Sequence, residues 1–193
     1  MKTRRRKKWS NKYKRSINCK KPRGFSQKQY CKRKNRKGGT RKIRKYAMAT
    51  LKLKNKVSGF VKFIKHKRGV KVVYNIKGLS DGLHGFHIHQ KKVTNGDCLS
   101  TSGHFNPDNK HHSGRHSNKR HAGDFGNIIS KKQKSSGSFV DSKISLDKHS
   151  KYYIIGRSIV VHEKVDDLGK GKNKESKITG NAGARLNCAT IKF

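Results

Sequence analysis

Acidic residues are scarce in this sequence and absent from its first 80 positions. The 193 residues include 51 Lys or Arg against 10 Asp or Glu, and the first acidic residue is Asp81. Residues 1–46 hold 22 of the basic residues and no acidic one, whereas residues 47–193 keep a net charge of +19 from 29 basic and 10 acidic residues. A basic domain with a still more basic N-terminal arm implies acidic surroundings or partners.

Long apolar segments are also missing. No apolar stretch of roughly 7–15 residues lies near the N-terminus, which argues against a secretory signal, and no run approaches the ~18 apolar residues of a membrane-spanning helix. We therefore expect no membrane partner and an intracellular protein. The cytoplasm is the first expectation, with the nucleus, the nucleolus or a nucleic-acid-rich particle as further possibilities.

Cysteine is rare, with four residues in two contexts. Cys19 and Cys31 lie in the arm, without a nearby histidine and with the wrong spacing for a zinc knuckle. Cys98 and Cys188 lie in the remainder of the chain. For two cysteines in a reducing compartment the first expectation is two free thiols.

The arm, residues 1–46, has few apolar residues and no hydrophobic period. Such a segment cannot bury enough surface to offset its conformational entropy, so we predict a disordered basic arm followed by a folded domain over residues 47–193. Its charge favours nonspecific binding to nucleic acid or another polyanion, or a role as a localisation signal, over a merely solubilising extension. Trp9, Tyr13 and Tyr30 could add base stacking but are few.

After the arm, short segments alternate between polar and apolar residues and are separated by turns rich in glycine, asparagine and charge. This pattern indicates antiparallel strands, and no helical period interrupts it. The segments are residues 49–54, 57–65, 70–76, 85–89, 125–129, 138–145, 158–162 and 185–191. They predict an all-β, eight-stranded antiparallel sandwich or flattened barrel. Residues 91–120 and 164–183 form two long polar loops of the kind that is often functional.

A set of six histidines and one aspartate lies between positions 87 and 162. On a strand, residues two apart point to the same face, so His87 and His89 can hold one ion together. Two such imidazoles with His162 and a fourth histidine form an all-nitrogen site suited to copper. Several histidines with one aspartate suit tetrahedral zinc. The residue types alone therefore predict a chain that holds two metals.

Five motifs in order make the segment from residue 47 onward resemble copper/zinc superoxide dismutase. They are Gly-Phe-His-Ile-His at 85–89, Gly-His-Phe-Asn-Pro at 103–107, His-Ala-Gly-Asp-Phe-Gly-Asn at 121–127, the segment from Val160 to Gly171, and Gly-Asn-Ala-Gly-Ala-Arg-Leu-Asn-Cys at 180–188. The resemblance implies a Greek-key β-sandwich with one copper and one zinc ion per subunit. It also implies dismutation of superoxide to dioxygen and hydrogen peroxide by a copper redox cycle, which protects against oxidative stress.

The resemblance assigns roles residue by residue. It implies copper ligands His87, His89, His104 and His162, and zinc ligands His104, His112, His121 and Asp124. His104 would bridge the metals and act in catalysis. Asp166 would orient ligands of both metals, Arg185 would anchor the anionic substrate, and Cys98 and Cys188 would form a disulfide. Only the spacing of the family selects His112 over its neighbour His111, and His116 is a further local candidate.

Two questions stay open at this stage. The segment Gln90-Lys91-Lys92 replaces the apolar pair through which family dimers contact each other, so a monomer or weakened dimer competes with the homodimer. A second function competes with the enzyme: a catalytically silent, metal-stabilised sandwich that binds nucleic acid through its arm or sequesters copper. The intact set of ligands, together with Asp166 and Arg185, favours the enzyme.

Overall fold

The computed structural model describes residues 9–37 and 46–193 of the chain. Two compact units emerge, Met1–Ile43 and Arg44–Phe193, and each is described by itself. Among the described residues, no helix is both long enough and apolar enough to cross a membrane.

The N-terminal unit contains two helices, α1 (Asn11–Ser16) and α2 (Gly24–Lys37), where the sequence predicted disorder. Ser10 caps α1, since its hydroxyl accepts a hydrogen bond from the backbone N–H of Tyr13 at 3.1 Å. A disulfide joins Cys19, which lies between the helices, to Cys31 in α2. The structure thus differs from the expected disorder over residues 9–37 and pairs two cysteines that were expected as free thiols. Residues 1–8 and 38–45 of the predicted arm lie outside the described residues.

A small aromatic cluster supports the disulfide. The ring of Trp9 lies 5.0 Å from that of Tyr13 and 5.9 Å from that of Tyr30 in edge-on arrangements. Ile17 and Cys31 are the only buried apolar residues in the described part of this unit. Three aromatic rings and one disulfide therefore take the place of a conventional core.

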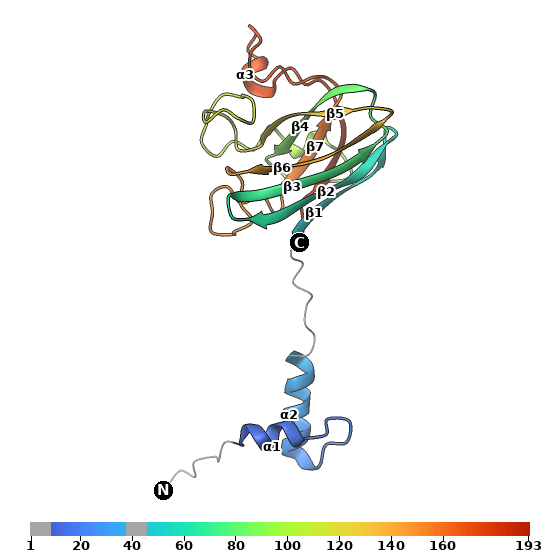
Figure 1. Ribbon diagram of the computed structural model, residues 1–193, viewed down its shortest axis with the longest axis vertical. Coiled ribbons are helices and arrows are strands. Elements are labelled where there is room, and N and C mark those ends of the chain that lie inside the picture. Colours follow the sequence, from blue (N-terminus) through green and yellow to red (C-terminus); the bar gives the residue numbers. More distant parts are fainter. Residues whose placement is uncertain (1–8, 38–45) are drawn as a thin grey trace. The chain divides into compact units, whose positions relative to one another are not determined.

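The second unit is a β-sandwich of two four-stranded antiparallel sheets (Figure 1). One sheet has the order β1-β2-β3-β6 and the other β5-β4-β7-β8. The strands are β1 (Tyr46–Lys54), β2 (Val57–His66), β3 (Gly69–Lys77), β4 (Gly82–His89), β5 (Asp124–Ser130), β6 (Lys134–Asp141), β7 (Ser158–His162) and β8 (Arg185–Thr190). The chain changes sheet after β3, β5 and β6, so the predicted Greek-key sandwich is confirmed.

Strand periodicity divides β4 between the core and the opposite face of its sheet. Phe86 and Ile88 are fully buried and pair with Val161 and Ile159 of β7 in the sandwich interior. Because side chains alternate along a strand, the histidines between and after them point to the other face. That face would be open to solvent if the loops on either side of it did not cover it.

Two long connections provide this cover. Residues 90–123 join β4 to β5 and contain a short 3-10 helix, η1 (Leu99–Thr101), and residues 163–184 join β7 to β8 and contain a one-turn helix, α3 (Ser176–Thr179). These correspond to the two predicted functional loops. Figure 1 shows α3 and the yellow-green part of the first loop gathered at the same end of the domain.

Contacts between the first and last strands close the sandwich toward a barrel. Met48 and Lys192 exchange backbone hydrogen bonds of 2.7 and 3.0 Å. Asn187 of β8 donates its side-chain amide to the carbonyl oxygens of Lys52 and Val57 at 2.7 and 2.8 Å. These bonds hold β8, and with it Arg185, against the other sheet.

Candidate metal centre

Strand pairing brings the predicted ligand residues together. A register shift in the β4–β5 pair places His87 opposite Asp124, and an isolated antiparallel bridge places His89 opposite His104. His162 ends β7, on the same face of the sheet as His87. The ligand side chains are almost completely buried beneath the loops, with His87 fully enclosed. Their convergence therefore follows from the register of the central strands.

Four imidazoles form the first group, His87, His89, His104 and His162, whose ligand-type nitrogens lie within 4.8 Å of one another. Three of them have one ring nitrogen fixed by a partner outside the group. His87 Nε2 lies 2.8 Å from Asp166 Oδ2, His89 Nδ1 lies 2.7 Å from the carbonyl of Ser102, and His162 Nδ1 lies 3.2 Å from the carbonyl of Gly183. An acceptor at one nitrogen fixes the proton there and leaves the other nitrogen with a free lone pair.

The remaining nitrogens meet in one place. His89 Nε2 and His162 Nε2 are 3.3 Å apart. Because Nδ1 of each ring donates its proton to a backbone carbonyl, both Nε2 atoms carry lone pairs and cannot hydrogen-bond to each other. His87 Nδ1 and His104 Nε2 are buried and have no hydrogen-bond partner within the described residues. Buried polar atoms without partners are costly, so a cation between these lone pairs would resolve the arrangement. An all-imidazole donor set fits copper.

The second group joins His104, His112, His121 and Asp124. Nδ1 of each histidine approaches the single oxygen Oδ1 of Asp124, at 2.9 Å from His104, 2.9 Å from His112 and 3.1 Å from His121. His112 Nδ1 nevertheless lacks hydrogen-bond geometry. Three nitrogens and one carboxylate oxygen around one point form the donor set of tetrahedral zinc. The other oxygen, Oδ2, accepts the backbone N–H groups of Ser113 and His121.

Asp166 connects the two groups. Its Oδ2 lies 2.8 Å from His87 Nε2 and its Oδ1 lies 2.7 Å from His112 Nε2, so one carboxylate orients a residue of each group. Asn127 fixes the backbone of Asp166 by accepting its N–H and donating to its carbonyl, both at 2.8 Å. A side chain on Gly180, which has φ of +69°, would collide with Asp166 and His112.

Burial makes the histidines of the first group resist protonation. Removal from water, together with neighbouring imidazoles, lowers the pKa of His87 and His162 to about 4 and that of His104 to about 3. Burial also lowers the pKa of His89. These rings are therefore neutral near pH 7, which is the form of histidine that binds metals.

In the second group, neighbouring carboxylates favour protonation of a histidine. Burial acts to lower the pKa of His112, but the carboxylates of Asp124 and Asp166 beside its two nitrogens raise it to about 9. Burial would likewise raise the pKa of Asp124, yet the three histidines hold it far below its usual value. The buried carboxylates thus stabilise a positive charge at this position. A bound metal cation would supply that charge and would displace the proton from His112.

Arg185 lies at the start of β8, beside the loop that follows β4. Its Nη1 donates to the carbonyl of Cys98 at 2.8 Å and to Thr101 Oγ1 at 3.1 Å. A disulfide joins Cys98 to Cys188, as the resemblance predicted. Both linkages hold the loop around η1 against β8, so the position of the guanidinium depends on an intact loop.

The structure brings together all the residues that the sequence assigned to the two metals, and it separates the alternatives. His111 and His116 are exposed and belong to neither group, whereas His112 is buried in the second. Sequence reasoning missed the part that Asn127 plays in holding Asp166. Asn127 is the last residue of the motif at 121–127, three positions after Asp124, but only the folded loop reveals its partner.

Comparison with known proteins agrees with this geometry. Residues 57–191 match the family model described as copper/zinc superoxide dismutase. Superoxide dismutase [Cu-Zn] 5 of Dictyostelium discoideum is 46% identical over 138 residues, which cover 70% of this chain and 90% of that protein. Superoxide dismutase [Cu-Zn] A of Xenopus laevis is 48% identical over 138 residues, which cover 71% of this chain and 90% of that protein.

A solved structure supports the same relationship. The crystal structure of the clock protein EA4 superimposes with a TM-score of 0.72 and 41% sequence identity, covering 77% of this chain and 94% of that one. The family match spans more than half of the chain and includes every strand from β2 to β8. The chain belongs to the copper/zinc superoxide dismutase family.

Proposed function

We propose that this protein is an enzyme that converts two superoxide anions and two protons into dioxygen and hydrogen peroxide, with copper and zinc as its cofactors. The observation that carries the proposal is the pair of buried donor groups that share His104 and are linked by Asp166. Membership of the family and the chemistry of the donor sets support the same conclusion.

Each donor group suits one metal. The copper ligands are His87, His89, His104 and His162, and the zinc ligands are His104, His112, His121 and Asp124. Bound copper supplies the one-electron redox chemistry, while zinc fixes the second donor group and its loop. The protein supplies rigid, neutral imidazoles, because the acceptors behind each ring fix its orientation and tautomer.

Arg185 is the residue placed to bind the substrate. Superoxide is a small anion, and the guanidinium of Arg185 presents hydrogen-bond donors and a permanent positive charge beside the first donor group. Two neighbours already hold its Nη1, so the side chain needs little ordering when the substrate arrives. The domain's charge of +19 over residues 47–193 would also attract the anion.

His104 is the residue placed to deliver a proton. Its Nδ1 faces Asp124 at 2.9 Å, and its Nε2 faces the first donor group without a hydrogen-bond partner in the described part of the chain. A nitrogen at this position can carry a proton to the reduced substrate. Burial lowers the pKa of His104 to about 3, so the metal-free ring is neutral near pH 7.

The proposal is tested by measuring superoxide dismutation together with copper and zinc content in three variants. His104→Ala should lose nearly all activity, whereas the exposed His149→Ala should keep it and serve as the matched control. Arg185→Gln should retain both metals and lose about tenfold or more in rate, since it removes substrate binding without touching the donor groups. Full metal occupancy without activity in the unaltered protein would refute the proposal that the protein is a superoxide dismutase.

The silent metal-stabilised sandwich is not favoured. A fold that used metal only for stability would need the zinc group but not four converging imidazoles, an anchored Arg185 and an available His104 Nε2. Buried polar atoms of this kind are costly to retain without a use.

For the N-terminal unit we propose nonspecific binding to nucleic acid, alongside the enzyme. Residues 9–37 contain 12 Lys or Arg and no acidic residue, so no charge within this segment neutralises them. Phosphate contacts of this kind release counterions and weaken steeply with salt. Oligonucleotide affinity of the full chain, compared with a chain that begins at residue 46, tests this partner. Equal affinity and salt dependence would exclude the N-terminal unit as the binding element.

We further propose that basic residues weaken self-association of the domain. Lys91, Lys92 and Lys192 are exposed, and a two-fold contact through them would bring like charges together. Light scattering at about 0.1 M and about 1 M salt distinguishes the outcomes, because screening should favour a dimer at high salt. A dimer that is equally stable at both concentrations would contradict this proposal.

A further inference from the structure

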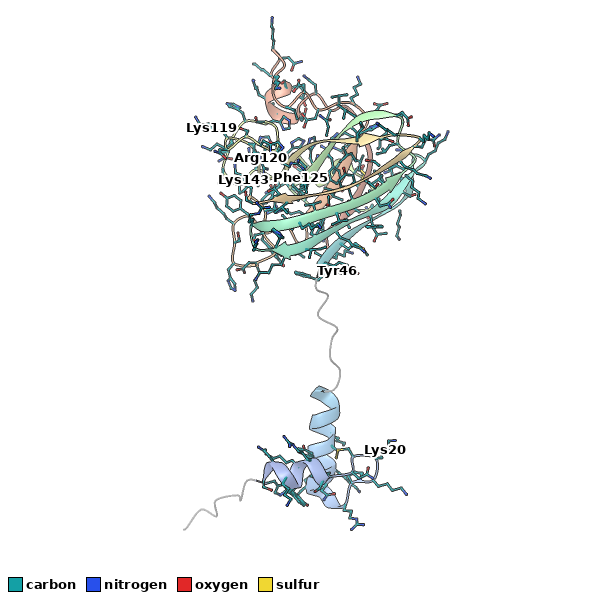
Figure 2. All side chains as sticks on the ribbon, viewed as in Figure 1. Lys20, Tyr46, Lys119, Arg120, Phe125 and Lys143 are labelled. Atoms are coloured by element: carbon teal, nitrogen blue, oxygen red, sulfur yellow. A yellow bond between two sulfur atoms is a disulfide. The ribbon has the colours of Figure 1, made fainter. Side chains whose placement is uncertain are left out.

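A basic pocket lies apart from the metal centre, between the β2–β3 turn, the loop after His112 and the end of β6. Its volume is about 680 Å³, and its walls include Arg68, Arg115, Arg120, Phe139 and Lys143. Figure 2 shows Arg120 and Lys143 on this side of the domain. Four of these five residues are cationic, and the only acidic residue in the wall is Asp141.

Asp141 is fully engaged in the floor of the pocket. Its Oδ2 accepts a 2.6 Å bond from Arg120 Nη2, and its Oδ1 accepts the backbone N–H of Lys143 at 2.8 Å. The Nη1 of buried Arg120 donates to the carbonyls of His121 and Ala122. This ion pair is therefore structural, and the charge of Asp141 is already matched by that of Arg120.

The guanidinium groups of Arg68 and Arg115 remain without an acidic partner. No ion pair to either one occurs within the described residues, and Arg68 is exposed. The guanidinium carbon of Arg115 lies over the ring of Phe139, 4.1 Å from its centroid, and this contact holds the side chain at the pocket wall. Lys143 Nζ donates to the carbonyls of Asn118 and Arg120, and an ammonium has a third proton to offer.

We propose that this pocket binds a phosphate group through Arg68, Arg115 and Lys143. Three cations beside one another suit a phosphate group, because it presents several acceptor oxygens around one phosphorus atom and carries one negative charge as a diester and close to two as inorganic phosphate. Arg115 already covers one face of Phe139, which makes that face unavailable to a base. The recognised element is accordingly the phosphate itself, either as a small ion or as part of a nucleic-acid backbone.

The first test uses inorganic phosphate and the full-length holoprotein, kept reduced with ascorbate so that copper is diamagnetic. Phosphate replaces chloride at constant ionic strength while backbone amide resonances are followed by NMR. We expect saturable shifts at residues 115–118 and 139–143. The Arg68→Gln/Arg115→Gln double variant should weaken this binding by about tenfold or more.

The matched control is Lys131→Gln/Lys148→Gln, which removes the same charge at exposed positions outside the pocket. It should keep the phosphate-dependent shifts, and both double variants should keep their zinc and their activity. Shifts that do not saturate, or that survive unchanged in the pocket variant, would overturn the proposal.

A second arm distinguishes the two sources of phosphate. If the pocket binds a nucleic-acid backbone, the pocket variant should lose more affinity for a single-stranded oligonucleotide, and more of its salt dependence, than the control variant. If both variants lose the same oligonucleotide affinity while only the pocket variant loses binding of inorganic phosphate, the natural occupant is a small phosphate-bearing ion.

Discussion

The two units of this chain each contain one disulfide, but the crosslinks perform different tasks. In the β-sandwich, strands bury apolar side chains such as Phe63, Phe86 and Ile159 completely, and the Cys98–Cys188 bond only fixes a loop to that core. In the N-terminal unit, Ile17 and Cys31 are the only buried apolar residues among those described. A segment below about 40 residues rarely folds without a crosslink or metal. A disulfide therefore supports a hydrophobic core in the β-sandwich and replaces one in the N-terminal unit.

Metal removal should produce the largest difference in thermal stability between the two units. Chelation leaves the imidazoles and Asp124 oxygens converging without a cation, so the melting temperature of the β-domain should fall by about 10 °C or more. Calorimetry of the metal-free and reloaded protein measures this change. The helical circular dichroism signal of the N-terminal unit should not respond, and loss of that signal on chelation would contradict the division into two independent parts.

Acid should destabilise the metal-free domain. Burial lowers the pKa values of His87 and His162 to about 4 and of His104 to about 3, against about 6.5 in the unfolded chain. The unfolded state therefore binds more protons below pH 6.5, and stability falls between pH 6.5 and about 4. Each histidine contributes up to about 1.4 kcal/mol per pH unit in this window. Urea unfolding at several pH values measures the slope, and a flat profile would contradict it.

The Cys98→Ser/Cys188→Ser variant should lower the stability of the β-domain by about 4 kcal/mol, because the bond closes a long loop. The domain should remain folded on its core. The folded variant should also lose activity, because Arg185 donates to the carbonyl of Cys98 and depends on this loop for its position. Urea titration and dismutation assays on metal-loaded protein measure the two effects. Unchanged activity would show that Arg185 does not depend on this loop.

The Cys19→Ser/Cys31→Ser variant should have a smaller free-energy effect, about 3 kcal/mol, because the closed loop is shorter. The N-terminal unit should nevertheless unfold completely, since the aromatic contacts of Trp9 cannot hold the helices together alone. Limited trypsin digestion should cleave residues 9–37 rapidly in the variant and slowly in the unaltered protein. Equal cleavage rates would show that the unit does not rely on its crosslink.

Sequence reasoning reached the β-domain in detail because its signals are local. Strand alternation located all eight strands, and the spacing His87-Ile88-His89 placed two imidazoles on one face. The start of β6 was missed by four residues, since Lys134, Ser135 and Ser136 are polar, although Ser135 is buried and donates to the carbonyl of Ile129. The one-turn helix α3 was missed because four residues show no period.

The N-terminal helices escaped prediction for a different reason. Low apolar content argued for disorder, but a disulfide and three clustered rings can stabilise a short helical hairpin with little buried surface. The serine cap before α1 and the 12-residue separation of the cysteines were the available signals. Neither reveals on its own which residues meet. The part that Asn127 plays was hidden likewise, because it depends on a loop 39 residues further along.

The most direct test of the account is a copper titration of the zinc-loaded, full-length protein with dismutation measured at each step. Four converging imidazoles define one copper site per chain, so activity should rise linearly to one equivalent of copper and then remain constant. The same titration of His87→Ala should give no comparable rise. Activity that is already present without copper, or that does not increase as copper binds, would contradict the proposal that this metal centre is a superoxide dismutase site.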